Sequence, residues 1–340
     1  MDMPLVSVII STYNEEKYIE DSINSILDQS YKNIEVIIVD DASTDKTVDL
    51  IKSIKSDKIK LFVNATNKKL AHNLNFAISK ANGEYVARMD ADDISRKDRI
   101  ITQVDYLEKH KDIDIVASYA KTFGDSKIVK KSPCTDEGIK TKLLFTNPIC
   151  HPTVMFRKSS LDFQYDESCA AGQDYELWTR LADKKKFHVI NKILLDYRVI
   201  KRQKEFIYLE LQKKSALKAK KHLFDKLFLY DSNENWNKFK LLIDVDFFDF
   251  QPKTEDQMKS IIGFANQLIE VNRKEKVFNE QELMKSLSTI VFQQWYLSLF
   301  NTNVSTDVFM KSAYRMALKQ EKVLTKMKVL YKIIKKNVIK

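Results

Sequence analysis

The sequence predicts an α/β protein with a doubly wound, mostly parallel sheet, followed by a mainly helical C-terminal region. Short β-branched runs alternate with amphipathic segments through residues 1–200, which is typical of strand–helix–strand units. Polar residues follow the expected strands at Asn14, Asp41 and Asp90. Ligands of such sheets bind at the carboxyl ends of the strands, so these three loops indicate a common site.

The individual elements follow from local patterns. The apolar runs expected to form strands are Leu5–Ser11, Ile34–Val39, Ile59–Val63, Glu84–Met89, Ile113–Ser118, Val154–Arg157 and Ile193–Val199. Helical spacing is found in Glu15–Gln29, Leu70–Ala81 and Gln173–Ala182, and a further helix is expected after the turn at Asp41–Asp45. From about residue 203 the chain becomes long helical stretches, so we place a boundary near Ile200 and expect domains 1–200 and 201–340.

Charge is distributed unevenly between these two parts. Residues 1–200 carry 30 Lys and Arg against 31 Asp and Glu, whereas residues 201–340 carry 27 against 16. The tail 322–340 contains seven lysines, no acid and apolar residues at helical spacing. Such a helix can lie on an anionic membrane surface, although a terminal helix packed on its own domain is the alternative.

Composition limits the class of protein further. Three widely spaced cysteines, no signal-peptide pattern and no apolar run long enough to span a bilayer predict a cytoplasmic protein, peripheral on the inner face of the cell membrane. The basic second part leaves a non-enzymatic protein that binds an anionic polymer as an alternative. No nucleic-acid-binding motif is present, so no nucleic-acid partner is expected.

The acidic cluster Asp90–Asp93 is the strongest candidate site. Asp90 and Asp92 lie two residues apart, so an extended chain places both side chains on one side. Carboxylate oxygens are preferred ligands of Mg²⁺ and Mn²⁺, which makes Asp90 and Asp92 candidate metal ligands. Asp93 is expected to cap a following helix. A solvated turn is the simpler alternative, but the preceding buried strand favours the metal site.

An ordered series of motifs runs through residues 4–200. They are Val6–Glu16, Ser25–Tyr31, Glu35–Asp45, Leu74–Asn75, Ala81–Tyr85, Met89–Asp93, Gly172–Trp178 and Tyr197–Arg198. Together they resemble glycosyltransferase family 2, whose members are inverting enzymes with the GT-A fold. The resemblance implies a GT-A type sheet with a Rossmann-like nucleotide-binding half.

The resemblance also implies roles for single residues on the donor side. The implied nucleotide-binding residues are Ser11, Thr12, Tyr13, Asp41, Lys69 and Asp90. Tyr13 would stack on uracil or another base, and Asp41 would hydrogen-bond that base. Asp90 and Asp92 would hold the ribose and the metal-bound diphosphate. Many members carry a His shortly after the Tyr-Arg pair, whereas here Val199–Arg202 follow and leave the metal shell one ligand shorter.

On the acceptor side, the resemblance implies that Asp174 is the general base. The N-terminus of a helix favours an ionised carboxylate, although a helix-capping aspartate is the structural alternative. For His151 the sequence leaves two roles open, a contact to the sugar or a purely structural role.

The expected reaction is metal-assisted single displacement with Mn²⁺ or Mg²⁺. The string Arg88–Ser95 resembles enzymes that add hexoses to lipid-linked surface-polysaccharide intermediates. The expected donor is therefore UDP-glucose or UDP-galactose, with a UDP-N-acetylhexosamine as the alternative. The expected acceptor is a hydroxyl of a glycan or of a lipid-diphosphate sugar.

Overall fold

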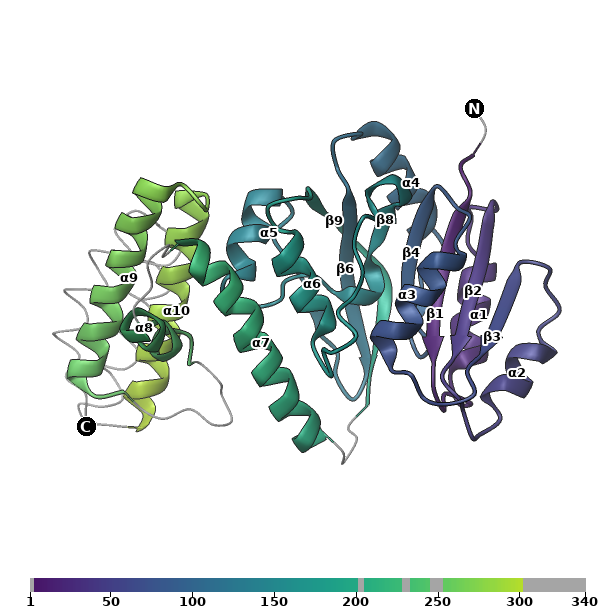
Figure 1. Ribbon diagram of the computed structural model, residues 1–340, viewed down its shortest axis with the longest axis horizontal. Helices are drawn as coiled ribbons and strands as arrows, with labels where there is room; N and C mark the ends of the chain where they lie inside the picture. Colours follow the sequence, from purple (N-terminus) through teal and green to yellow (C-terminus); the bar gives the residue numbers. More distant parts are fainter. Residues whose placement is uncertain (1–2, 201–204, 228–232, 245–252, 302–340) are drawn as a thin grey trace. The chain divides into compact units, whose positions relative to one another are not determined.

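The computed structural model describes residues 3–200, 205–227, 233–244 and 253–301 (Figure 1). Contacts between Cα atoms divide the chain into two units, Met1–Lys220 and Lys221–Lys340, and each is described by itself. The expected boundary near Ile200 stays a prediction. The basic helix expected in the tail 322–340 lies outside the described residues.

The first unit is built on one mixed sheet with the strand order β3-β2-β1-β4-β8-β6-β9-β5, and β7 pairs with β6. The strands are β1 (Val6–Thr12), β2 (Ile34–Asp40), β3 (Ile59–Val63), β4 (Tyr85–Asp90), β5 (Ile94–Ser95), β6 (Ile115–Gly124), β7 (Val129–Lys130), β8 (Met155–Arg157) and β9 (Phe187–Val199). The neighbours β1, β2, β3 and β4 pair in parallel and stand side by side in Figure 1. This confirms the predicted parallel half.

Helices cover both faces of the parallel half. The helices of this unit are α1 (Ile19–Leu27), α2 (Thr47–Ser53), α3 (Leu70–Lys80), α4 (Arg99–Lys109), α5 (Asp136–Leu143) and α6 (Gln173–Leu181). Side chains alternate along a strand, so each strand packs on two layers. Val8 and Ile10 of β1 pack into one core with Ile23 of α1, whereas Ser11 points to Asn73 of α3 on the other face.

The C-terminal region is helical, as predicted. Its helices are α7 (Glu205–Leu227), which crosses the division between the units, α8 (Asn233–Ile243), α9 (Glu255–Glu275) and α10 (Glu280–Asn301). Within the second unit, Gln294 of α10 donates to the carbonyl oxygens of Leu241, Leu242 and Asp244 and so closes the end of α8. Among the described helices, none has the length and apolar character needed to cross a membrane.

The register of the parallel strands brings three loops to one edge of the sheet. Thr12 lies opposite Asp40, and Ser11 lies opposite both Val39 and Asp90. The loops after β1, β2 and β4 therefore start level with one another, at the carboxyl ends where a ligand binds.

A buried polar network fixes the opposite, amino ends of these strands. The carboxylate of Glu35 accepts hydrogen bonds from Ser7 Oγ at 2.6 Å, Lys60 Nζ at 2.6 Å and Asn82 N at 2.7 Å. A side chain at Gly83 would bring Cβ to 2.6 Å from Ser7 N, so only glycine fits there. Burial alone raises the pKa of Glu35, but the hydrogen bonds outweigh it and lower the pKa to about 2.

Replacing Glu35 by Gln should lower the free energy of unfolding by about 1–3 kcal/mol at neutral pH, because its donors lose a charged acceptor. The folded pKa lies below the ordinary glutamate value. The stabilisation is therefore complete above the unfolded pKa and is lost as the pH falls toward about 2. Chemical denaturation across this pH range measures the effect, with Glu84→Gln at an exposed position as the control. Equal stability of the two variants at neutral pH would contradict the assignment.

Candidate active site

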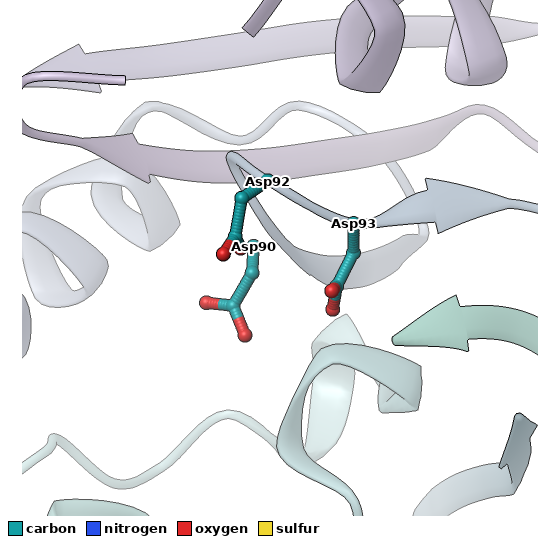
Figure 2. Close-up of side chains that lie close together, drawn as sticks. All are labelled: Asp90, Asp92 and Asp93. Atoms are coloured by element: carbon teal, nitrogen blue, oxygen red, sulfur yellow. The ribbon is translucent and has the colours of Figure 1, made fainter. Parts of the chain in front are cut away.

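Three carboxylates gather where β4 ends. Asp90 is the last residue of β4, and Asp92 and Asp93 follow in the turn before β5. Figure 2 shows all three side chains pointing to the same side of this turn. One carboxylate oxygen from each lies within 4.8 Å of the others, a spacing that a single cation can bridge.

Asp93 belongs to this acidic group, and the expectation that it caps a helix is wrong. The residues after it form β5, which pairs with β9, and α4 begins only at Arg99. Asp93 is fully buried; its Oδ1 accepts from Arg198 N at 2.8 Å, and its Oδ2 has no donor among the described residues. Burial and the negative charge of Asp90 raise the pKa of Asp93 to about 8. A buried acceptor without a donor, within a group of mutually repelling carboxylates, fits a divalent cation.

Arg88 supplies the positive charge behind this cluster. Its guanidinium is 3% exposed and forms an ion pair with Asp90 through Nη2. Its Nε and Nη1 have no partner in the described part of the chain. The sequence places Arg88 in a strand without assigning it a role. The signal that could have identified it is a cation inside an apolar run, two residues before Asp90 and therefore on the same side of the strand.

Asp174 lies at the start of α6, in a half-buried position. Its Oδ2 accepts a hydrogen bond from Asn147 Nδ2 at 2.7 Å. Burial raises the pKa of Asp174, against the opposing effects of the Tyr175 amide, the Arg88 charge and Asn147. The helix N-terminus therefore does favour the ionised form, as expected, but burial is the larger effect. The result is a carboxylate more basic than an ordinary aspartate and close enough to Arg88 to interact with its charge.

His151 has a structural partner rather than a free ring. Its Nε2 lies 2.8 Å from the hydroxyl of Tyr165, and its ring meets Trp178 of α6 edge-on. Burial lowers the pKa of His151 well below its ordinary value, so the ring is neutral. These contacts favour the structural role over a contact to the sugar.

The expected nucleotide side is formed by loops that bind one another. Asn14 Oδ1 accepts from Thr44 N at 2.8 Å, which joins the loops after β1 and β2. Asp41 accepts from Lys68 N at 2.7 Å and from Lys69 N at 3.0 Å, which joins the β2 loop to the segment before α3. Asn64 Nδ2 also donates to Asp41, at 3.0 Å. A carboxylate has about four acceptor sites, so Asp41 retains room for one more donor.

The other residues predicted to bind the nucleotide lie in these loops or at the end of β1. Tyr13 is 47% exposed, which leaves its ring free to stack. Thr12 Oγ1 is buried with no partner among the described residues, and Ser11 Oγ accepts from Asn73 at 3.1 Å. Lys69 is exposed and has a φ of 74°, in the left-handed region that glycine adopts most readily. Asp174 comes from a separate element and interacts with the acidic cluster through the charge of Arg88.

Arg198 explains the Tyr-Arg motif. Its Nε donates to Asp92 O at 2.7 Å, while its backbone N–H binds Asp93. The guanidinium carbon also lies 4.1 Å from the Tyr18 ring centroid and 4.4 Å from that of Phe123. Arg198 therefore holds the acidic turn in place. Lys201 and Arg202, which follow the motif, lie outside the described residues.

Loops gathered at the carboxyl ends of parallel strands, an acidic cluster and a separate carboxylate with a raised pKa are the features expected of a GT-A transferase. The family model described as glycosyl transferase family 2 matches residues 7–163. The putative glycosyltransferase EpsE of Bacillus subtilis is 40% identical over 189 residues, which is 52% of this chain and 66% of EpsE. An uncharacterized glycosyltransferase of Methanocaldococcus jannaschii is 34% identical over 249 residues, 68% of this chain and 85% of that protein. The chain therefore belongs to glycosyltransferase family 2 and is a glycosyltransferase.

Two further comparisons bear on fold and substrates. The Escherichia coli UDP-Glc:alpha-D-GlcNAc-diphosphoundecaprenol beta-1,3-glucosyltransferase WfaP is 33% identical over 186 residues, 54% of this chain and 72% of WfaP. The crystal structure of Staphylococcus aureus TarS 1–349 in complex with UDP-GlcNAc superposes with a TM-score of 0.57 at 18% identity, covering 87% of this chain and 90% of TarS 1–349. This likeness confirms the predicted GT-A fold.

Replacing Asp92 by Asn should weaken Mn²⁺ binding about tenfold or more, because one charged oxygen ligand is lost. Titration calorimetry with Mn²⁺ measures this directly. Asp98→Asn is the matched control, since Asp98 is exposed and precedes α4 outside the cluster. An Asp92 variant that binds Mn²⁺ as the control does would remove Asp92 from the metal site.

Proposed function

We propose that this glycosyltransferase moves a hexose from UDP-glucose or UDP-galactose to a sugar hydroxyl of a lipid-linked polysaccharide intermediate, with inversion. The observation that carries the proposal is that carboxylates from two separate elements both interact with the charge of Arg88. Asp90 forms an ion pair with it, and Asp174 is subject to its charge from a different element. One site suits the donor diphosphate, and the other suits the acceptor proton.

The donor nucleotide is assigned to the joined loops at the sheet edge. The exposed ring of Tyr13 would stack on uracil, and the hydroxyl of Thr12, which has no partner among the described residues, would face the same pocket. Asp41, Ser11 and Lys69 would complete this pocket. Asp41 would use its remaining acceptor site for the base, while its other bonds hold the Lys68–Lys69 loop.

The divalent cation is assigned to Asp90 and Asp92, with Asp93 beside them. When bound, Mn²⁺ or Mg²⁺ would neutralise the negative charge that develops on the departing diphosphate. Arg198 donates a hydrogen bond to the Asp92 carbonyl oxygen and so supports the turn that carries these carboxylates. Arg88 limits the repulsion among the carboxylates.

Asp174 is assigned as the general base. It would take the proton of the acceptor hydroxyl while that oxygen attacks the anomeric carbon from the face opposite the diphosphate. The carbon–oxygen bond to the diphosphate breaks, and its electron pair leaves with UDP. An α-linked donor thus gives a β-linked product. Burial supports this role because it makes Asp174 a stronger base, and Asn147 holds one oxygen in a fixed orientation.

The substrate classes are supported by what the relatives' names state. WfaP is named for a UDP-Glc donor, a lipid diphosphate acceptor and a β-1,3 linkage. The TarS complex contains UDP-GlcNAc, which supports a UDP-N-acetylhexosamine as the second candidate donor. The basic composition of residues 201–340 also suits a lipid-linked acceptor. The enzyme would then be peripheral on the inner face of the cell membrane. Its catalytic domain would lie in residues 1–200.

Asp174→Asn should lower kcat by about a thousandfold, within the range for loss of a general base, and leave UDP affinity unchanged. Glu176→Gln on the same helix is the control, because Glu176 pairs with Arg180. Steady-state UDP release and calorimetric UDP binding measure the two quantities. Near-normal turnover of the Asn variant would refute the assignment.

The wild-type enzyme should also lose activity as the pH falls through the raised pKa of Asp174, since only the ionised carboxylate accepts a proton. The acid limb of kcat/KM should therefore lie above the ordinary aspartate value of about 3.9. A profile of UDP release against pH measures the limb. A midpoint at or below that value would contradict a base whose pKa is raised by its surroundings.

The donor and acceptor are tested by a screen of UDP release with Mn²⁺, using a short lipid-diphosphate sugar as acceptor. We expect acceptor-dependent release from UDP-glucose or UDP-galactose. Release from UDP-N-acetylhexosamines alone would establish the second candidate donor. Release that does not depend on the lipid-diphosphate sugar would exclude the acceptor class.

A further inference from the structure

The hairpin that joins β6 to β7 exposes apolar side chains between lysines. The exposed run is Lys127-Ile128-Val129-Lys130-Lys131. Ile128 is 59% exposed, the highest value among the large apolar side chains of the described residues, and Val129 is 39% exposed. Apolar groups kept in water beside positive charge need an explanation.

The exposure is fixed by the way the hairpin is built. Thr122 Oγ1 accepts from Ile128 N at 2.7 Å, and Thr122 N donates to Ile128 O at 2.8 Å. The turn is held against β9, because Asp125 N donates to Val199 O at 2.9 Å and Gly124 has a φ of 85°. The backbone of Ile128 is therefore anchored while its side chain faces solvent.

The hairpin carries a net positive charge, with Asp125 in its turn and lysines at 127, 130 and 131. Lys127, Lys130 and Lys131 form no ion pair with an acidic residue in the described part of the chain. Lysines on an edge strand can simply prevent edge-to-edge pairing. That explanation accounts for the lysines but leaves the exposed Ile128 and Val129 unexplained, whereas an anionic bilayer offers phosphates for the first and an apolar layer for the second.

The hairpin lies beside the acidic turn of the active site. Lys130 Nζ is 4.0 Å from the centroid of the Tyr197 ring, in the Tyr-Arg motif. Phe123 at the end of β6 packs on the guanidinium of Arg198, which binds the carbonyl of Asp92. A partner that binds the hairpin therefore also lies near the acidic turn.

We infer that Lys127–Lys131 is the edge through which the active site contacts an anionic phospholipid bilayer. Lys127 and Lys131 lie at the headgroup phosphates, Lys130 stays on the Tyr197 ring, and Ile128 and Val129 enter the boundary of the acyl chains. The inference rests on the proposed lipid-linked acceptor, whose diphosphate lies at the bilayer surface. A hairpin bound to the bilayer would place the acidic turn at the level of the acceptor diphosphate. The proposed contact therefore serves the same active site, and it is separate in sequence from the basic tail 322–340.

Vesicle sedimentation with the full chain tests the inference, using phosphatidylcholine vesicles with and without phosphatidylglycerol and no donor or acceptor. Lys127→Gln with Lys131→Gln should lower the partition coefficient on anionic vesicles by about fivefold to thirtyfold. Ile128→Ser with Val129→Ser should lower it as well. The matched controls are Lys52→Gln with Lys55→Gln, two exposed lysines at the end of α2 and just after it, and Val63→Ser at an exposed apolar position of β3. Hairpin variants that bind like these controls would overturn the inference.

A second measurement stays informative if a hairpin variant folds poorly. The fluorescence gained in Ile128→Trp should be quenched by brominated lipid in anionic vesicles, whereas that gained in Val63→Trp should not. Equal quenching of the two would overturn the inference. Both assays omit substrates, so a failed donor screen would contradict the proposed function and leave these results unaffected.

Discussion

The parallel pairing of β1 with β2 and β4 is the constraint on which the rest of the site depends. It sets Thr12 opposite Asp40 and Ser11 opposite Asp90, so the loops that follow start at one level. A slip of one residue would turn every side chain of a strand to the other face. The two packed faces of β1 and the Glu35 network at the amino ends of the strands both resist such a slip.

Arg88 is the second constraint, and it is electrostatic. A buried guanidinium is tolerated only with negative partners, and removal of one partner of a buried pair costs about 3–5 kcal/mol. Arg88 pairs with Asp90 and opposes the effect of burial on the pKa of Asp174. The charge of Arg88 thus acts on the carboxylates assigned to the metal site and on the carboxylate assigned as the base. This shared charge links the two halves of the proposed reaction.

The sequence was sufficient for the elements whose patterns are local. The run Ile59–Val63 is a strand with the bounds expected, and Leu70–Ala81 is a helix that ends one residue earlier. Short strands and contacts between distant residues could not be predicted from the sequence. The sequence predicts a helix cap at Asp93 because nothing local shows that Ile94–Ser95 pairs with β9, about a hundred residues away. Asn147 was missed as the partner of Asp174 for the same reason: the two are 27 residues apart and meet only in the fold.

In the proposed enzyme, one acidic turn supported by Arg88 and Arg198 would hold the cation of the donor complex. The most direct test is anomalous diffraction at the manganese edge from crystals grown with UDP and Mn²⁺. We expect one strong peak bonded to carboxylate oxygens of the Asp90–Asp93 turn and to the UDP phosphates. A peak at other residues, or UDP bound away from this turn, would contradict it.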